Sequence, residues 1–213
     1  MLFSQLAVLL LGIPLLFAGC AHTSPDAKAL PWWVAAPSAP LPKGFPPPGP
    51  LDEIIIKQYP PSRAAVARAA KEGESANRMF YPLFDHIEKN HIAMSSPVDI
   101  GYAPTTAPGA KPRSMAFIYG EQTWGSLGSD GTVQVQDAPA VTVVSIGVAG
   151  AYTDARFAKA YGLLSAWLES HAAEYVADGD PRYLAYNGPF VLPFARYGEV
   201  QVPIRPAKQG KGN

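Results

Sequence analysis

The stretch that decides the fold spans residues 76–98 and is ANRMFYPLFDHIEKNHIAMSSPV. Its first part carries apolar side chains at three- and four-residue steps, which is the spacing of one face of an amphipathic helix. These side chains are Met79, Phe80, Leu83, Phe84 and Ile87. Pro82 lies within the pattern, and we expect it to kink the helix or to mark its real start. The stretch therefore predicts a helix that packs on a sheet through one apolar face.

Strand-like segments flank this helix on both sides. Residues 53–59 and 63–69 are rich in β-branched and apolar residues, and Pro60-Pro61 between them is typical of a turn, so they predict a hairpin. After the helix, residues 92–102 and 114–120 also favour strands, joined by a loop rich in Pro, Thr and Gly. The predicted unit is ββαββ.

The same order of elements occurs again in the second half of the chain. Strand-like residues fill 132–148 around a turn at 137–139, which predicts a second hairpin. Thr153 is a good N-cap for a helix whose apolar face runs to Tyr175. The two last strands lie within residues 183–204. A second ββαββ unit follows from this order.

A local echo also supports an internal repeat. The runs after the two helices carry Ala and Pro four residues apart, as Ala93 and Pro97 in the first and Ala185 and Pro189 in the second. We therefore predict an α+β fold made of two ββαββ units. Neither unit can close a core alone, so the two are expected to pack together and to leave a seam where a small ligand can bind.

Composition excludes several classes of protein. The chain has 213 residues, 17 Lys+Arg against 17 Asp+Glu, and is 48% hydrophobic, so no basic surface for nucleic acid is expected. Its single cysteine excludes an internal disulfide and any multi-cysteine metal site. The length fits one globular domain with appendages. Nothing in the composition indicates a protein partner.

The N-terminus is typical of an exported protein. Residues 1–20 contain no charged side chain, and the apolar run 6–17 is short and interrupted, as in the hydrophobic part of a signal peptide. It ends in LFAGC at residues 16–20, which resembles the bacterial lipobox. That resemblance implies lipidation of Cys20 and membrane attachment. Ala21 after it implies a periplasm-facing lipoprotein of the outer rather than the inner membrane. The alternative is an uncleaved anchor with a buried thiol.

Residues 21–50 are predicted to be a linker. The segment contains nine prolines, which block both helix and sheet and favour an extended, semi-rigid spacer between the membrane and the domain. Trp32 and Trp33 within it are expected either at the lipid interface or packed on the domain. Residues 206–213 are predicted to be a flexible C-terminal tail.

Two separated motifs resemble the SOUL/heme-binding protein family. Residues 76–98 resemble the family's helix and its Lys-Ile-Ala-Met-Thr-x-Pro-Val run, and residues 186–200, YNGPFVLPFARYGEV, resemble its C-terminal motif. The resemblance covers residues 51–205. It implies a distorted β-barrel of two pseudo-symmetric halves with a helix on each, akin to bacterial effector-binding domains, and binding of heme or another tetrapyrrole. The departures from the motifs are His91, Ser95 and Gly198.

A tetrapyrrole site needs an apolar slot, basic groups for the propionates and, in some cases, an axial ligand. The candidate basic residues are Arg63, Arg78 and Arg196. The candidate apolar residues are Met79, Phe80, Leu83, Met94, Phe190 and Phe194. The alternatives stay open that the helix residues are core and that Arg196 pairs with Glu199.

The histidines do not identify an axial ligand. His171 lies on an apolar helix face, where it is either a ligand or a hydrogen-bonded histidine at the edge of the core. His86 and His91 cannot share a metal from one helical face, and they are expected at a solvated helix end. His22 belongs to the linker. The metal-ligating residue therefore remains unknown.

The sequence favours a binding protein over an enzyme. It contains no Gly-x-Ser-x-Gly, His-Glu-x-x-His, Walker or Rossmann motif. Glu199 is the one carboxylate of interest, because a buried glutamate can attract a cation or act as a base. Two hypotheses follow. The first is an envelope-anchored protein that binds heme or another tetrapyrrole. The second is a non-heme module, either an effector-type barrel for small amphipathic cations or a structural envelope lipoprotein.

Overall fold

The computed structural model describes residues 29–107 and 109–207. The predicted signal peptide, Cys20, His22, the start of the linker and the end of the tail lie outside these residues. The elements, in chain order, are β1 (Ile54–Tyr59), β2 (Ser62–Arg68), α1 (Ala76–Lys89), β3 (Val98–Tyr102), β4 (Pro112–Ile118), β5 (Gly128–Asp130), β6 (Val133–Ala138), β7 (Val141–Ala149), α2 (Asp154–Ser170), β8 (Tyr175–Ala177), β9 (Arg182–Ala185), η1 (Pro193–Ala195) and β10 (Tyr197–Pro206).

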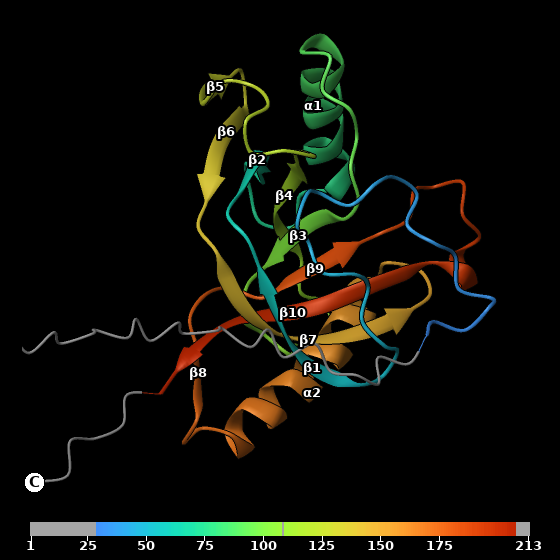
Figure 1. Ribbon diagram of the computed structural model, residues 1–213, viewed down its shortest axis with the longest axis vertical. Helices are drawn as coiled ribbons and strands as arrows, with labels where there is room; N and C mark the ends of the chain where they lie inside the picture. The colour runs from blue at the N-terminus through green and yellow to red at the C-terminus, as the bar shows by residue number, and fades with distance from the viewer. Residues whose placement is uncertain (1–28, 108, 208–213) are drawn as a thin grey trace, which may run out of the picture.

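One bent antiparallel sheet carries the two helices at its opposite ends (Figure 1). The strand order is β1-β7-β10-β9-β3-β4-β2-β6-β5, and β8 pairs with β10 beside this path. The order is two-fold symmetric about the contact between β3 and β9, with α2 packed against β7 and β10 and α1 against β2 and β4. This confirms the α+β fold of two pseudo-symmetric halves. The sheet is barrel-like but not closed.

The two predicted hairpins are wrong, because β1 pairs with β7 and β2 pairs with β6. The register is the same throughout, from Ile54 opposite Ile146 to Tyr59 opposite Val141, and from Ser62 opposite Ala138 to Ala67 opposite Val133. The proline pair at 60–61 and Pro139 interrupt this long ladder and do not reverse the chain. Proline lacks the backbone N–H that donates to a neighbouring strand, so it interrupts the pairing. A bend within a ladder and a turn between two strands therefore have the same sequence pattern. Each half thus receives one strand from the other.

Both helices bury most of the faces that their spacing predicts, although Phe84 of α1 is 37% exposed. Met79, Leu83 and Ile87 of α1 are buried, as are Phe157 and Leu164 of α2. Helix α1 begins at the residue after Ser75, so its proline lies inside it and does not mark its start. Buried residues of the two halves form one continuous hydrophobic cluster. The two halves are joined by this cluster and by the strand pairs β1–β7, β2–β6 and β3–β9.

Several predicted boundaries differ from the structure. Thr153 caps α2 as expected, its hydroxyl accepting from the Arg156 N–H at 3.3 Å, but the helix ends at Ser170 and Tyr175 begins β8. The repeated Ala and Pro residues do not occupy equivalent positions in the two halves, since Ala185 ends β9 whereas Ala93 precedes β3. The repeat lies in the order of elements and not in this echo.

The start of β3 and the end of β10 also differ from the predicted positions. Strand β3 begins only at Val98, because Ser95 and Ser96 direct their hydroxyls to the carbonyls of Ile118 and Tyr186. Residue 206 ends β10 and pairs with Tyr175 of β8, and the next residue donates to the Glu174 carbonyl at 2.8 Å. These two residues of the predicted tail therefore belong to the folded domain.

The N-terminal segment, residues 29–50, packs along the domain and is not a spacer (Figure 1, blue). Val34 is buried against Tyr186 and Tyr197. The Ser96 N–H donates to the Pro40 carbonyl at 3.0 Å. Further along, Gly147 allows the segment to cross β7, because a Cβ there would lie 2.3 Å from the Pro50 oxygen. The prolines do exclude helix and sheet, yet backbone hydrogen bonds still dock the segment.

Within residues 29–107 and 109–207, no helix is both long enough and apolar enough to span a membrane.

Candidate functional site: an open groove and a covered polar cluster

The inner face of the sheet, opposite the helices, has two regions with different surroundings. Alternation along β2 turns Ala65 and Ala67 into the core and places Ala64 and Val66 on the inner face. In the first half, this inner face lines a groove. In the second half, the inner face is covered by the N-terminal segment.

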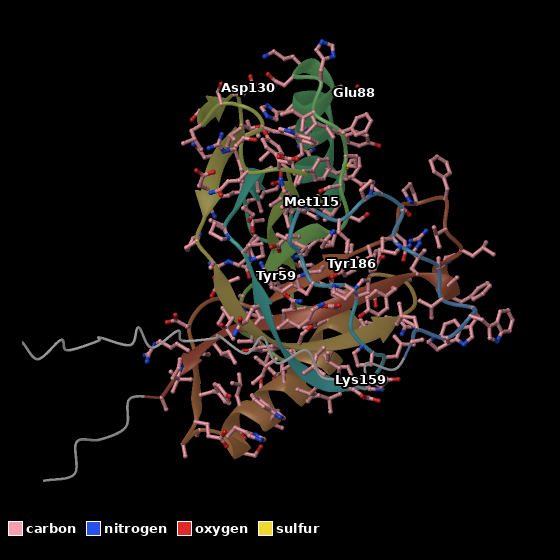
Figure 2. All side chains as sticks on the ribbon, in the orientation of Figure 1. Tyr59, Glu88, Met115, Asp130, Lys159 and Tyr186 are labelled. Atoms are coloured by element: carbon pink, nitrogen blue, oxygen red, sulfur yellow. The ribbon has the colours of Figure 1, made fainter. Side chains whose placement is uncertain are left out.

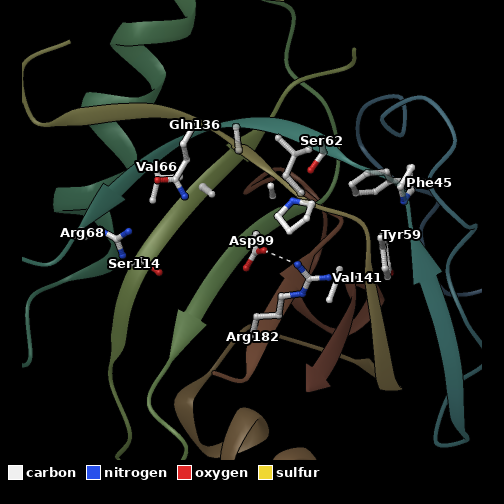
Figure 3. A pocket seen from close by; sticks show the side chains of 16 residues that line it. Phe45, Tyr59, Ser62, Val66, Arg68, Asp99, Ser114, Gln136, Val141 and Arg182 are labelled. Atoms are coloured by element: carbon white, nitrogen blue, oxygen red, sulfur yellow. Dashed lines mark hydrogen bonds and ion pairs between the residues drawn. The ribbon is translucent and has the colours of Figure 1, made fainter. Parts of the chain in front are cut away.

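The groove has a volume of about 220 Å³ and an apolar floor of small side chains (Figure 3). Strands β2, β4 and β6 supply most of the floor, Phe45 of the N-terminal segment forms one end, and Arg68 stands at the other. The lining residues are Phe45, Tyr59, Pro60, Ser62, Ala64, Val66, Arg68, Asp99, Ser114, Ala116, Ile118, Gln136, Ala138, Pro139, Val141 and Arg182. The groove can therefore receive one edge of a flat apolar molecule.

An ion pair crosses the middle of the groove (Figure 3). Arg182 Nη1 lies 3.1 Å from Asp99 Oδ2, and Arg182 Nε donates to Gln201 Oε1 at 3.0 Å. The guanidinium also lies 5.2 Å from the centre of the Tyr59 ring. Burial raises the pKa of Asp99 above its usual value, and the charge of Arg182 opposes that rise. The groove thus has an ion pair without net charge at its centre and an exposed cation, Arg68, at its end.

The covered half contains a buried polar cluster around Glu199, whose side chain has no exposed surface. Lys57 Nζ donates to both carboxylate oxygens, at 2.8 and 2.9 Å. The Gly49 N–H adds a bond of 2.7 Å from the N-terminal segment. The Ser145 hydroxyl and the Gln201 amide donate at 2.9 and 2.7 Å. The carboxylate is neutralised and fully hydrogen-bonded without a ligand.

The charges of this cluster depend on one another. Burial alone would raise the pKa of Glu199, but the Lys57 ammonium and the hydrogen bonds from Lys57, Gly49 and Ser145 hold it below its usual value. Burial lowers the pKa of Lys57, and Glu199 opposes that change. Lys57 also donates to the Pro47 carbonyl at 2.9 Å. The ion pair therefore fastens the N-terminal segment to the sheet.

None of the residues predicted to contact the ligand lines the groove. Met79 and Leu83 are fully buried under α1, and Phe80 and Met94 pack against the same core. This agrees with the alternative that the helix stripe is core. The sheet separates the buried face of α1 from the groove, because the helix packs on the opposite face of β2 and β4.

The predicted arginines lie outside the groove. Arg63 forms an ion pair with Asp137 at 2.7 Å, and Arg78 is exposed on α1. Arg196 donates to the carbonyls of Val191 and Pro189 at 2.8 and 2.9 Å. The predicted pair between Arg196 and Glu199 is wrong, since Glu199 pairs with a lysine far away in sequence.

The remaining candidates lie at the surface. Phe190 and Phe194 are exposed in the loop between β9 and β10. His171 is the C-cap of α2 and stacks on Trp167 with 4.1 Å between ring centres. That position matches the prediction of a hydrogen-bonded histidine at the core edge, because its Nδ1 lies 2.9 Å from the Trp167 carbonyl.

The prediction of a solvated helix end at His86 is wrong. His86 is buried, with Nδ1 2.8 Å from Asp130 Oδ2 and Nε2 2.9 Å from the Tyr119 hydroxyl. Figure 2 places Asp130 at the tip of the molecule beside α1. This cluster fastens the β5–β6 region to the helix. In contrast, His91 is exposed. Among the described residues, no three His, Cys, Asp or Glu side chains gather as a metal site.

Residues 50–203 match the sequence model of the SOUL heme-binding protein family. The chain belongs to this family. One departure of the SOUL protein from the family motif has a local reason, because a Cβ on Gly198 would lie 2.6 Å from the Tyr183 ring and 2.8 Å from the Leu184 carbonyl. A glycine is therefore needed where β10 passes β9.

Solved structures confirm the fold at low identity. The C-terminal domain of EcmrR is 19% identical, with a TM-score of 0.57 over 73% of this chain and 98% of that one. EcmrR in its DNA complex is 18% identical, with a TM-score of 0.58 over 73% of this chain, and the match spans only 58% of EcmrR. A hydrolase from Listeria innocua is 9% identical, with a TM-score of 0.50 over 74% of this chain and 94% of that one. Curated proteins give no significant match.

The groove fits some features of heme and not others. It supplies an apolar floor and one exposed cation, Arg68, for an acid group. Of the residue types that ligate heme iron, the described lining residues include only tyrosine, at Tyr59. The Gln201 amide donates to that hydroxyl at 2.8 Å, and burial raises the Tyr59 pKa, so a phenolate ligand is disfavoured. At about 220 Å³, the groove is also smaller than pockets that enclose a drug-sized ligand, which reach about 300 Å³ or more.

Proposed function

We propose that this SOUL protein binds a tetrapyrrole or a similar flat, acidic, amphipathic molecule in the groove, as a carrier, buffer or sensor and not as an enzyme. The observation that carries the proposal is the combination, in one groove, of an apolar floor with the exposed cation of Arg68 at its end. Family membership supports the ligand class. One edge of the macrocycle would rest on the floor while a carboxylate meets Arg68.

In this proposal, the protein holds the macrocycle and its acid groups, and the iron takes no ligand from the groove. No histidine, methionine or cysteine is among the described lining residues, and the Tyr59 hydroxyl is already engaged. Porphyrins with and without iron are therefore expected to bind alike. A heme bound in this way would keep its iron accessible to a second protein or to solvent, which suits transfer of the ligand.

Titration of the detergent-solubilised chain tests this proposal. Metal-free protoporphyrin, followed by its fluorescence, and hemin, followed by quenching of tryptophan, are expected to give similar dissociation constants. Arg68→Gln is expected to weaken both about three- to fivefold, as for an exposed charge pair. Arg78→Gln is the matched control, because it removes an exposed arginine outside the groove. Binding of hemin alone, or equal effects of the two variants, would contradict the proposal.

A cationic ligand at Glu199 is less well supported. A carboxylate attracts a cationic ligand only when its charge is not already paired within the protein. Glu199 is already paired, because Lys57 Nζ lies 2.8 Å from its Oε1. The N-terminal segment covers the same carboxylate through the Gly49 N–H. The open groove is therefore the better candidate than the covered cluster.

We also propose that the protein is an envelope lipoprotein attached through Cys20, on the strength of the LFAGC motif at the end of an apolar run. Metabolic labelling with a radioactive fatty acid is expected to label the wild-type chain and not Cys20→Ser. Label that persists in Cys20→Ser would contradict lipidation at this residue.

A further inference from the structure

Five of the eleven exposed large apolar side chains among the described residues, including the two most exposed, lie in two segments of the molecule. The N-terminal segment exposes Trp32 (95%) and Trp33 (39%), and the loop between β9 and β10 exposes Phe190 (100%), Leu192 (61%) and Phe194 (64%). A contiguous exposed apolar surface on a folded domain marks an interaction site. We call these five residues the aromatic edge.

Hydrogen bonds place the two segments side by side. The Ala35 N–H donates to the Ala195 carbonyl at 2.8 Å. The Asn187 amide donates to the Ala36 carbonyl at 2.7 Å, and the Gly188 N–H donates to Ser38 Oγ at 3.0 Å. The two segments also lie next to each other on one side of Figure 1. The aromatic edge is therefore one surface formed by residues far apart in sequence.

The loop is built to keep these side chains exposed. The Arg196 guanidinium donates to the carbonyls of Val191 and Pro189, at 2.8 and 2.9 Å, and so holds the backbone of the loop in place. A short 3-10 turn, η1, and two prolines further restrict it. Because the backbone is held in place, Phe190 and Phe194 cannot fold back onto the core without breaking these bonds.

The chemistry of the edge matches a lipid headgroup region. Tryptophan favours membrane interfaces, where an apolar ring and a polar N–H are both satisfied. Residues 29–42 contain no charged side chain, and residues 186–198 contain one, Arg196. No carboxylate in these two stretches would repel anionic lipid, and the single charge is positive.

The position of the predicted anchor leads to the same surface. Cys20 precedes residue 29 by a stretch of chain that can span at most about 30 Å. Residue 29 lies just before Leu30, which packs beside Val34 next to the edge. An acyl group on Cys20 would therefore hold this side of the domain within reach of the bilayer.

We propose that the aromatic edge rests in the headgroup region of the bilayer to which Cys20 is attached. This inference rests on the proposed lipid anchor. The edge fixes the orientation of the domain, while the acyl chains supply most of the affinity, since stable attachment takes more than one membrane signal.

Depth-dependent quenching tests the orientation. The full chain is reconstituted in phosphatidylethanolamine/phosphatidylglycerol vesicles that contain brominated lipid, as single-tryptophan variants with phenylalanine at the other three positions. Variants that retain Trp32 or Trp33 are expected to lose most of their emission. The variant that retains Trp124 is the matched control, because Trp124 is 38% exposed, about as much as Trp33, in a loop of the first half. It is expected to keep its emission, and equal quenching of all three would overturn the proposal.

Two further readouts separate the causes of failure. Fatty-acid labelling of Cys20 reports the anchor: label without quenching of Trp32 overturns the edge and leaves the anchor standing. Quenching of Trp32 without label supports the edge and rejects the anchor. If Trp32 emission shifts to the blue in detergent without vesicles, and the protein sediments as a dimer, the edge is an interface between two copies and the membrane proposal is wrong.

Discussion

The two halves of the sheet share one layout and differ on the face away from their helices. In the second half, residues 45–50 lie over Glu199, and every partner of that carboxylate comes from the chain itself. In the first half, the equivalent face is open and leaves Arg68 and the pair of Arg182 with Asp99 beside a groove. The N-terminal segment causes this difference, because it covers the inner face of the second half and contributes only Phe45 to the groove of the first half.

The difference shows how one scaffold separates stability from binding. A buried charge is costly unless it is paired and hydrogen-bonded, and the covered half meets both conditions. The open half has less burial and keeps Arg68 exposed to solvent, where an acidic ligand can meet it. We therefore expect substitutions in the covered half to change folding, and substitutions in the open half to change binding.

Removal of the cation from the covered half is expected to have the largest effect. Lys57→Met leaves Glu199 buried without its partner, which is expected to lower the free energy of unfolding by about 3–5 kcal/mol. Urea denaturation measures the change. Arg205→Met is the control, because it removes a half-exposed ion pair and is expected to cost less than about 1 kcal/mol. Equal losses would mean that the buried pair does not stabilise the covered half.

The crossing of the N-terminal segment over β7 is expected to be the next most sensitive point. Gly147→Ala places a methyl group 2.3 Å from the Pro50 oxygen, so we expect a loss of about 1–3 kcal/mol. Trypsin is also expected to cut faster after Lys43. Gly162→Ala, inside α2 with open space around it, is expected instead to stabilise by about 0.5–1 kcal/mol. If both variants behave alike, the segment is not held at this crossing.

Acid is expected to weaken the covered half selectively. The pKa of Glu199 is held below its usual value of 4.5, so its contribution to stability is present above that pH and is lost as the pH falls through the lower, folded-state value. The wild type is therefore expected to lose more stability than Glu199→Gln between pH 7 and pH 3, in paired urea denaturation experiments. A Glu199→Gln variant with the same pH dependence as the wild type would show that the pair carries no such linkage.

Filling the open groove is expected to change stability least. Ala116 lies on the groove floor and is half-buried, so Ala116→Leu adds apolar surface without displacing core atoms. We expect its free energy of unfolding to stay within about 0.5 kcal/mol of the wild type. A larger loss in thermal denaturation would mean that the groove is part of the packed core.

Sequence patterns predicted the helices, the repeat and the family, because these depend on local spacing and on contiguous motifs. They did not predict which strands pair, since Pro60-Pro61 gives the same signal for a bend as for a turn. The pair of Lys57 with Glu199 joins residues 142 positions apart, and no local pattern reports such a contact. The groove residues were missed because small side chains such as Ala64 carry no chemical signal. The available clue is the alternation along β2. One face of this strand carries Ala65 and Ala67 of the core, and the other carries Ser62, Ala64, Val66 and Arg68.

The most direct test of the account measures protoporphyrin affinity in one variant from each half, Ala116→Leu and Glu199→Gln, at neutral pH after circular dichroism has shown that both are folded. The account predicts that Ala116→Leu weakens binding at least about tenfold, because the methyl groups occupy the space of the macrocycle edge, and that Glu199→Gln binds like the wild type. Unchanged affinity in Ala116→Leu, together with lost affinity in Glu199→Gln, would place the ligand in the covered half and contradict the account.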